Sequence, residues 1–396
     1  MLWSVYSLRN LWARRVTTLL TLSGLGLVVF VFVAILMLAH GLEQTMGRTG
    51  DPSNAILLSK GALSEIESSL SRDQTGVLAA QPDVVTLEDH QVAAEDHQVA
   101  AVREIALQLT LRKQDRGSLA SLSVRGSSPV AFAVRPRVRI VRGRAWQPGT
   151  TEVIVGSQVA RQFPEARLAD TLRFGRREWT VVGIFEAEGS GFDSEVWGDV
   201  DQMMTTFHRT AFSSMTLRLA DPDGLPAFKA RLERDPRFKV SVKREPEYYE
   251  GKAEGLARLI RVTGLFLTVV FSVGAILGAT MTMSASVAHR TTEIGTLRTV
   301  GFTRSHILQA FLLESVLLGL TGGLLGVAGA ALLNHVTIST VNWDTGAELA
   351  FGFHLTPGMA GEGVLFAVFM GLIGGLVPAA RAARLEIVQA LGERTA

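Results

Sequence analysis

The stretch from Leu19 to Ala39 decides the class of fold, because it reads LLTLSGLGLVVFVFVAILMLA and contains no charged side chain. As an α-helix rising 1.5 Å per residue, these 21 residues extend about 30 Å, the thickness of a bilayer's hydrocarbon core. The apolar part of a cleavable signal peptide is shorter, about 7 to 15 residues, and no small-residue cleavage site stands out after Ala39. The stretch therefore predicts a membrane anchor.

Three further apolar runs lie in the second half of the chain, at Val262 to Met283, Ile307 to Leu333 and Gly363 to Ala380. Charged residues make up only 19% of the 396 residues, whereas soluble domains average about 25%. Because the apolar excess is concentrated in these runs, the composition excludes a purely cytosolic enzyme. The absence of cysteine excludes disulfides and thiol chemistry, and a net charge of +2 gives no support for nucleic-acid binding.

The positions of arginine predict the orientation, because short loops rich in Lys and Arg stay cytoplasmic. Basic residues precede the first run, fill the loop between the second and third, and follow the fourth: Arg9, Arg14, Arg15, Arg290, Arg298, Arg304, Arg381, Arg384 and Arg394. The connection from Asn334 to Glu362 contains neither Lys nor Arg. We therefore expect a multi-pass membrane protein with both termini cytoplasmic and a large domain on the far side of the membrane.

The expected fold is an α-helical membrane protein with four transmembrane helices and a large α+β extracytoplasmic domain inserted between helices 1 and 2. The expected segments are an interfacial elbow helix (1–15), TM1 (16–40), the periplasmic core domain (41–255), TM2 (256–285), a cytoplasmic loop with a coupling helix (286–306), TM3 (307–333), a periplasmic loop (334–360), TM4 (361–382) and a cytoplasmic tail (383–396).

Short β-rich runs and turn residues predict the α+β character of the large domain, which has one or two lobes. The strand-like runs are Ala55–Leu58, Val138–Val141, Glu152–Val155, Trp179–Ile184 and Met215–Leu219, and helix-compatible spacing covers Ser64–Ala80 and Pro226–Arg234. Tyr248 and Tyr249 lie near the entry of the second membrane helix, where interfacial aromatic residues are common.

An exact tandem repeat occurs at residues 88–101, where EDHQVAA is followed by a second EDHQVAA. On a helix, His90 and His97 would share a face and could be drawn as a metal site. A solvated helix or a loop lengthened by duplication is the favoured interpretation. We expect no metal site and no catalytic residue in the chain.

Small residues at four-residue spacing in the apolar runs predict close helix packing, because they let helix backbones approach each other in lipid. The glycines concerned are Gly274, Gly278, Gly319, Gly322, Gly323, Gly326, Gly371 and Gly375. We expect most of them to pack within one chain and some to serve an oligomer.

The loop between the second and third runs predicts a short amphipathic helix over Thr291–Val300. Gly301 is placed for a left-handed cap, and Ser305 is expected to open the next helix. Ile294, Leu297 and Val300 are expected on one side. Such a helix either lies on the membrane surface or docks onto a cytosolic partner.

Here the sequence resembles a known family. EIGTLRTVGF (293–302), FLLES (311–315) and the glycines that follow are similar to the permease signature of MacB/FtsX-type ABC transporters. RNL (9–11) resembles the family's amino-terminal elbow helix, and PAARAARL (378–385) resembles the carboxy-terminal end of the family's permease region. The stretches 152–156 and 181–184 resemble its periplasmic core domain. Two departures, Val16 and Ile387, affect only finer contacts at the cytoplasmic surface.

The resemblance implies a partner ATPase, because the family works with an ATP-binding subunit and this chain contains no G-x-x-x-x-G-K-[ST] motif. It implies that the segment from Thr291 to Gly301, including Gly295, is the coupling helix. Its polar contacts would be Glu293 and Arg298, and its buried contacts Ile294 and Leu297. ATP and Mg would be held by the partner and no cofactor by this chain. The resemblance also implies a dimer of permeases, expected to be a homodimer, and a periplasmic adaptor in the exporters. It further implies that the chain lies in a bacterial inner membrane, with the large domain periplasmic.

The mechanism expected from these features is mechanotransmission. Glu314 is the single ionisable residue within the apolar runs, and it lies near a helix start where a carboxylate is favoured, so a hydrophilic conduit is disfavoured. ATP-driven movement would pass along the second helix, from Gly255 to about Ala288, to export or extract an amphiphilic, lipid-linked or peptide substrate. Two alternatives stay open: an FtsX-like regulator of a cell-wall hydrolase that transports nothing, and a membrane sensor with a ligand-binding outer domain.

Overall fold

The computed structural model describes residues 15–87, 99–112, 119–341 and 348–385, which form two compact units. The helical unit comprises the chain up to Gly41, Arg258–Val336 and the part from Gly352 onward. The sheet unit comprises Leu42–Ala257 and Thr337–Phe351. The elbow helix expected over residues 1–15 and the histidines of the tandem repeat lie outside the described residues, apart from Arg15 in the first case.

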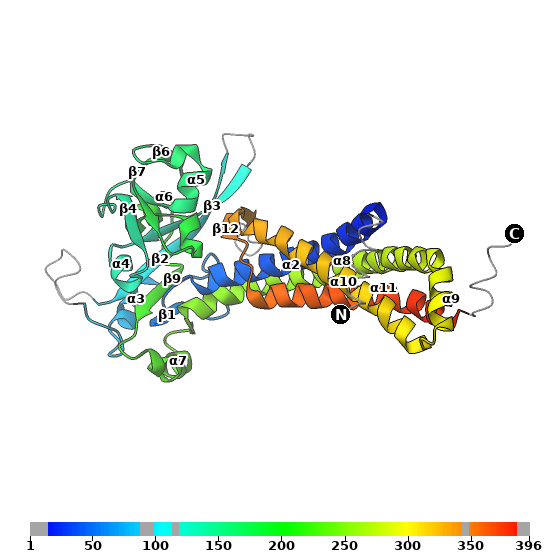
Figure 1. The fold of residues 1–396 in the computed structure, drawn as a ribbon. Helices are drawn as coiled ribbons and strands as arrows, with labels where there is room; N and C mark the ends of the chain where they lie inside the picture. The colour runs from blue at the N-terminus through cyan, green and yellow to red at the C-terminus, as the bar shows by residue number, and fades with distance from the viewer. Residues whose placement is uncertain (1–14, 88–98, 113–118, 342–347, 386–396) are drawn as a thin grey trace. The chain divides into compact units, whose positions relative to one another are not determined.

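Four helices among the described residues are long and apolar enough to cross a membrane (Figure 1). They are α2 (Arg15–Gly47), α8 (Glu245–His289), α10 (Arg304–Ala331) and α11 (Pro357–Arg384). The largest extensions beyond the expected spans are in α2, which ends at Gly47, and in α8, which begins ten residues before Gly255. The start of α8 therefore belongs to the sheet unit and its larger part to the helical unit.

Capping residues explain where the later helices begin. The Thr303 hydroxyl accepts a hydrogen bond from the His306 backbone N–H, so Thr303 caps α10 instead of the expected Ser305. Thr356 caps α11 in the same way, with Pro357 at the first helical position. Between α8 and α10 lies the short helix α9 (Thr291–Thr299), and Gly301 follows it with φ +108°, the left-handed conformation expected there.

Six of the eight glycines expected in helix contacts approach neighbouring helices closely. A Cβ on Gly326 would lie 2.5 Å from the Gly26 carbonyl oxygen, and one on Gly319 would lie 2.6 Å from that of Ala367. These contacts join α10 to α2 and to α11, and the others of this kind are Gly322, Gly323, Gly371 and Gly375. Gly274 and Gly278 on α8 differ, since no atom lies within 4 Å of a Cβ built there.

An open apolar groove of about 350 Å³ accounts for that difference. It runs between α2 and α8 within the helical unit, and its lining includes Leu20, Gly24, Phe271, Gly274 and Gly278. The two α8 glycines thus face a groove that the described residues of this chain leave open.

The sheet unit is built on one ten-stranded sheet. The strand order is β10-β1-β9-β2-β3-β8-β5-β7-β4, and β6 pairs with β7 off this path. The strands are β1 (Asn54–Ser59), β2 (Ala101–Arg112), β3 (Leu119–Ser127), β4 (Arg139–Gly143), β5 (Glu152–Gly156), β6 (Thr171–Phe174), β7 (Arg177–Glu186), β8 (Glu195–Asp199), β9 (Ser214–Arg218) and β10 (Val240–Arg244). A separate two-stranded sheet, β11 (Thr337–Val341) and β12 (Glu348–Gly352), lies in the connection expected to be a loop.

Short helices complete the sheet unit: α3 (Arg72–Ala79), α4 (Val130–Val134), α5 (Ser157–Gln162), α6 (Val200–Thr206) and α7 (Leu225–Arg234). The helix expected over Ser64–Ala80 is wrong for its first half. Ser71 begins α3 with a capping box, in which its hydroxyl accepts from the Gln74 N–H and the Gln74 side chain accepts from the Ser71 N–H. The preceding residues instead form turns, in which the Glu65 side chain is buried.

The sheet buries an apolar core on each face, because side chains alternate along a strand. On β1, Ala55 and Leu57 join one core, while Ile56 and Leu58 join the other. The first core includes Trp179 and Phe228, and the second includes Trp197. The second face also carries the charged residues that form the candidate site.

Candidate functional site

One face of the first two turns of α8 is directed into the sheet unit. Glu245, Tyr248, Tyr249 and Lys252 have the spacing i, i+3, i+4 and i+7, which places them on a single helix face. Glu245 is fully buried, and the two tyrosines are 4% and 5% exposed. The expectation that these tyrosines act as exposed interfacial aromatics is therefore wrong, since both pack in the second core.

The opposing surface is the second face of four adjacent strands, β9, β2, β3 and β8. Alternation along each strand places one set of polar side chains on this face: Ser214, Thr216, Glu104, Arg125, Ser127 and Glu195. Arg135, which follows α4, and Glu65 complete the group, which we call the ion network together with Glu245, Tyr249 and Lys252. Its members come from seven separate segments of the sequence.

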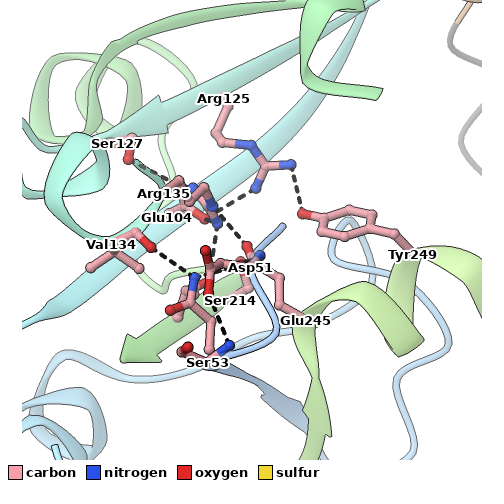
Figure 2. Close-up of polar contacts among 12 residues, drawn as sticks. Asp51, Ser53, Glu104, Arg125, Ser127, Val134, Arg135, Ser214, Glu245 and Tyr249 are labelled. Carbon is pink, nitrogen blue, oxygen red and sulfur yellow. Dashed lines mark hydrogen bonds and ion pairs between the residues drawn. The ribbon is translucent and has the colours of Figure 1, made fainter. Parts of the chain in front are cut away.

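Arg135 joins the sheet to α8 (Figure 2). Its Nη1 and Nη2 donate to the two carboxylate oxygens of Glu104, both at 2.7 Å, and its Nε donates to Glu245 Oε1 at 2.7 Å. The guanidinium also lies over the Phe192 ring, 4.8 Å from its centroid. All three charged side chains are at most 1% exposed, so these are charge-assisted bonds screened from water.

Arg125 forms the second centre of the network. Its Nε and Nη2 donate to Glu195 at 2.8 and 2.9 Å, and its Nη1 donates to Glu65 at 2.8 Å. Nη2 also donates to the Tyr249 hydroxyl at 3.2 Å, as Figure 2 shows. The Lys252 amine lies 3.8 Å from Glu65. Two arginines thus hold the starting turns of α8 against the sheet.

The charges of the ion network nearly balance, with three cations (Arg125, Arg135, Lys252) against four carboxylates. Burial raises the pKa of Glu65, but attraction by Arg125 and Lys252 outweighs it and holds that pKa well below its usual range. The pKa of Glu104 is lowered in the same way, because Arg135 and Arg125 outweigh its burial. Both carboxyls are therefore ionised at neutral pH.

The segment that follows α2 contacts the same carboxylate of α8. The Asp51 N–H and the Asn54 side-chain amide donate to Glu245 Oε2 at 3.0 and 2.7 Å. Gly50 has φ +88°, and a Cβ there would collide with the Glu245 side chain, so only glycine fits. Glu245 is thus the point at which the segment after α2, the start of α8 and the sheet face are hydrogen-bonded together.

In the helical unit, α9 has a buried and an exposed side. Ile294, expected at the partner contact, is only 2% exposed and packs instead against residues such as Met283, Phe311 and Ala382 of the same chain. Leu297 is half-buried in that cluster, and Arg298 Nη1 donates to the Leu385 carbonyl at 3.2 Å. The expected grouping of Val300 with Ile294 is also wrong, because Val300 is 74% exposed. The exposed residues of α9 and its cap are Thr292, Glu293, Thr296, Thr299 and Val300.

Glu314 is paired within the helical unit. It is 5% exposed, and its Oε2 accepts a hydrogen bond at 3.0 Å from Nη1 of Arg290, which caps α9. The pair joins α10 to the start of α9. A structural role accounts for this carboxylate, and the residues that the structure describes contain no group of three His, Cys, Asp or Glu side chains arranged to hold a metal ion.

Comparison with protein families decides the class of the molecule. Residues 18–235 match the MacB-like periplasmic core domain, and residues 265–387 match the FtsX-like permease C-terminal region. The chain belongs to the MacB/FtsX-type family of ABC transporter permeases. It is accordingly a membrane protein with an extracytoplasmic domain, and the α+β sheet unit is that domain.

Individual relatives agree with this family. The uncharacterized ABC transporter permease YknZ of Bacillus subtilis (strain 168) is 30% identical over 227 residues, 53% of each chain. The macrolide export ATP-binding/permease protein MacB 1 of Aeromonas hydrophila is 29% identical over 313 residues, 72% of this chain and 45% of the relative. The chain thus matches about half the length of these relatives. The crystal structure of the YknZ extracellular domain covers 48% of this chain and 99% of that domain, with 14% identity and a TM-score of 0.36.

The ion network had a signal in the sequence that was missed. The stretch EPEYYEGK (245–252) carries its polar and aromatic residues at helical spacing, and its position before an apolar run made it look like a membrane-interface segment. Arg125 lies in SLSVRGS, where flanking residues alternate between the two sheet faces. Alternation indicates which face Arg125 occupies, but local sequence does not indicate which carboxylates lie opposite.

Proposed function

We propose that this chain is the permease subunit of an ABC transporter and that it transmits movement from a separate ATP-binding subunit to its extracytoplasmic domain. Export or extraction of an amphiphilic, lipid-linked or peptide substrate would follow from that movement. The sheet unit would lie between the first and second crossings on the periplasmic side, and both chain termini would be cytoplasmic. The relatives' descriptions as ABC permeases, one of them for macrolide export, support this class.

The observation that carries the proposal is the continuity of α8. It is a single helix of 45 residues, about 67 Å at 1.5 Å per residue. At one end Glu245 is locked into the ion network, and at the other His289 is separated from α9 by Arg290 alone. A helix anchored by directional, buried bonds at one end can pass a displacement of the other end to the sheet unit, provided that the anchor does not slip.

The ATP-binding partner would contact the exposed side of α9. Ile294 is unavailable for that role because it is buried in the chain's own core. Glu293, already expected at this contact, is exposed on α9, and the exposed Val300 at its cap takes the place of Ile294 and Leu297 as the apolar contact. ATP and Mg would be bound by that partner. The pairing of Arg298 with the carbonyl after α11 would keep α9 in a fixed orientation.

A second copy of the chain would complete the permease. The groove between α2 and α8 leaves Gly274 and Gly278 without a close neighbour among the described residues, and small residues of this kind favour close helix approach in lipid. A homodimer with the groove covered by the partner copy is the arrangement these features support best.

Co-purification with an ABC ATP-binding subunit from native membranes tests the proposal. The test variant is Val300→Asp on α9, and the matched control is Val77→Asp on α3, where the valine is 51% exposed. We expect the ATP-binding subunit with the unaltered chain and with Val77→Asp, and its loss with Val300→Asp at unchanged membrane insertion.

Failure of the unaltered chain to retain any ATP-binding subunit would favour the sensor alternative and overturn the proposal. Retention of that subunit by Val300→Asp would overturn the assignment of the contact surface. If a cell-wall hydrolase is retained and no substrate moves in reconstituted vesicles, the FtsX-like regulator is the correct function.

A further inference from the structure

The most basic stretch of the sheet unit has no role in the ion network apart from its first residue. Residues 135–144 read RPRVRIVRGR, with five arginines in ten residues and no acidic residue. Arg135 is buried, and Arg144 is bonded to Glu152 at 2.5 and 2.7 Å. The three arginines between them, Arg137, Arg139 and Arg142, are exposed and make no side-chain hydrogen bond or ion pair among the described residues.

The strand β4 within this stretch is at one edge of the ten-stranded sheet. β4 is the last strand in the order, and among the described residues it pairs with β7 alone. Among its partners on β7, Glu186 opposite Arg139 is the one acidic residue. An unpaired edge presents a row of backbone N–H and C=O groups that an extended chain can pair with.

A bulge shapes this edge. The register of β4 on β7 shifts between Ile140 and Arg142, which leaves Val141 without a β7 partner and 49% exposed. Bulges commonly redirect a side chain at sheet edges and beside functional sites. The edge therefore presents an exposed apolar side chain between two exposed cations. The cations alone would be enough to prevent edge-to-edge aggregation, so that role does not explain the exposed valine.

We propose that the β4 edge docks an acidic, extended polypeptide segment of an extracytoplasmic partner, which adds a strand to the sheet. Backbone bonds to β4 supply the pairing, carboxylates face Arg139 and Arg142, and an apolar side chain covers Val141. The observations favour a polypeptide over an anionic lipid surface, because a lipid headgroup would use the arginines but neither the strand edge nor Val141. This proposal does not depend on the ATP-binding partner.

The test measures peptide binding to the full chain in nanodiscs of zwitterionic lipid, by anisotropy of a short dye-labelled peptide in which Glu alternates with Val. The same peptide with every second backbone amide methylated cannot pair as a strand. The test variant is Arg139→Glu/Arg142→Glu. The matched control, Arg209→Glu/Arg234→Glu, makes the same charge change at two exposed arginines elsewhere in the sheet unit.

We expect the unmodified peptide to bind the unaltered chain and the control equally. The test variant should bind at least tenfold more weakly, a change of about 1.4 kcal/mol. The methylated peptide should bind comparably weakly, and hydrogen exchange of Arg139–Gly143 should slow on binding of the unmodified peptide. Added salt should weaken binding, because exposed charges are screened.

Equal binding of the methylated peptide would overturn strand addition and leave non-directional attraction, as on a lipid surface. Equal losses in both charge-reversed proteins, or no peptide binding at all, would also overturn the proposal and leave the arginines as protection against aggregation. The neutral variant Arg139→Gln/Arg142→Gln guards against misfolding and should bind with intermediate affinity. Unchanged emission of the buried Trp146, Trp179 and Trp197 checks the fold of each variant.

Discussion

Replacement of Arg135 by Met should destabilise the sheet unit strongly. The guanidinium makes three bonds of 2.7 Å to two buried carboxylates, Glu104 and Glu245. Removing one partner of a buried ion pair costs about 3 to 5 kcal/mol, because the remaining charge is left unpaired in an apolar surrounding. Here two carboxylates lose a partner, although Arg125 and Ser127 still contact Glu104. We therefore expect a loss of about 4 kcal/mol in the free energy of unfolding.

The assay is a urea titration of the full chain in nanodiscs, followed by the fluorescence of the sheet unit's buried tryptophans. With a denaturant dependence of about 2.5 kcal/mol per M, a loss of about 4 kcal/mol moves the midpoint down by about 1.5 M urea. Arg144→Met is the matched control, since Arg144 forms a similar pair with Glu152 at the surface. Exposed pairs contribute little, so that midpoint should hardly move.

The pH dependence of the loss identifies its cause. In the unaltered chain the pKa of Glu104 is lowered, so its contribution to stability is present above the unfolded pKa and is lost as the pH falls through the folded one. Without Arg135, burial dominates and raises the folded pKa above the unfolded value. The folded variant then binds the extra proton, and its stability falls as the pH rises through that range. The deficit should therefore be larger at pH 8 than at pH 5.

A triple variant separates the loss of pairing from the loss of packing. Replacing Glu104, Arg135 and Glu245 together with Met, Met and Leu removes every charge that Arg135 pairs with. Such apolar replacements of a buried ion group are often neutral or stabilising. A midpoint for Arg135→Met no lower than that of Arg144→Met, or a deficit that does not change with pH, would refute this account of the network.

Three further predictions concern the helical unit. Ile294→Asp should destabilise it and lower membrane levels, because it buries a charge in the chain's own core, whereas Val300→Asp should insert normally; quantitative blotting of membranes compares them, and equal levels would contradict the assignment. Gly326→Ala should lower the free energy of unfolding in detergent by about 1 to 3 kcal/mol, because the added methyl group overpacks against α2, whereas Gly278→Ala should not lower it. Equal stability of the two variants in thermal unfolding would argue against the α2 contact. Because the chain has no native cysteine, Gly278→Cys should cross-link two copies in membranes and Leu365→Cys on α11 should not; the reverse pattern would exclude the proposed dimer groove.

The membrane helices could be predicted from sequence because their signal is local. A run such as Leu19–Ala39 is apolar whatever it packs against, and its length alone matches a bilayer. The start of α8 could not be predicted in the same way, since Glu245 and Lys252 read as polar flanking residues until the sheet is present to receive them. Ion pairs between residues as far apart as Glu65 and Arg125 depend on strand order, which no short window contains.

The error at α9 has a different origin. Apolar residues at helical spacing predict that one side of the helix is buried, and this is correct for Ile294. Periodicity does not say whether the burying surface belongs to the same chain or to a partner. Here α8, α10 and α11 supply Met283, Phe311 and Ala382, so the apolar side is already occupied within the chain, and the contact with the proposed partner is assigned to the polar side.

The composition of the ion network bears on the mechanical proposal. An apolar contact between α8 and the sheet would stabilise the unit at least as well, because buried ion pairs give up much of their attraction to desolvation. Apolar contacts are non-directional, however, and would tolerate rotation or sliding of a helix along the sheet. Arg135 Nε donates to Glu245 and Arg125 Nη2 donates to the Tyr249 hydroxyl, so a turn of α8 about its axis would break both bonds and leave buried charges unpaired. We infer that the ion network fixes the register of α8, and that the triple apolar variant keeps its fold while losing the transmission of force proposed above.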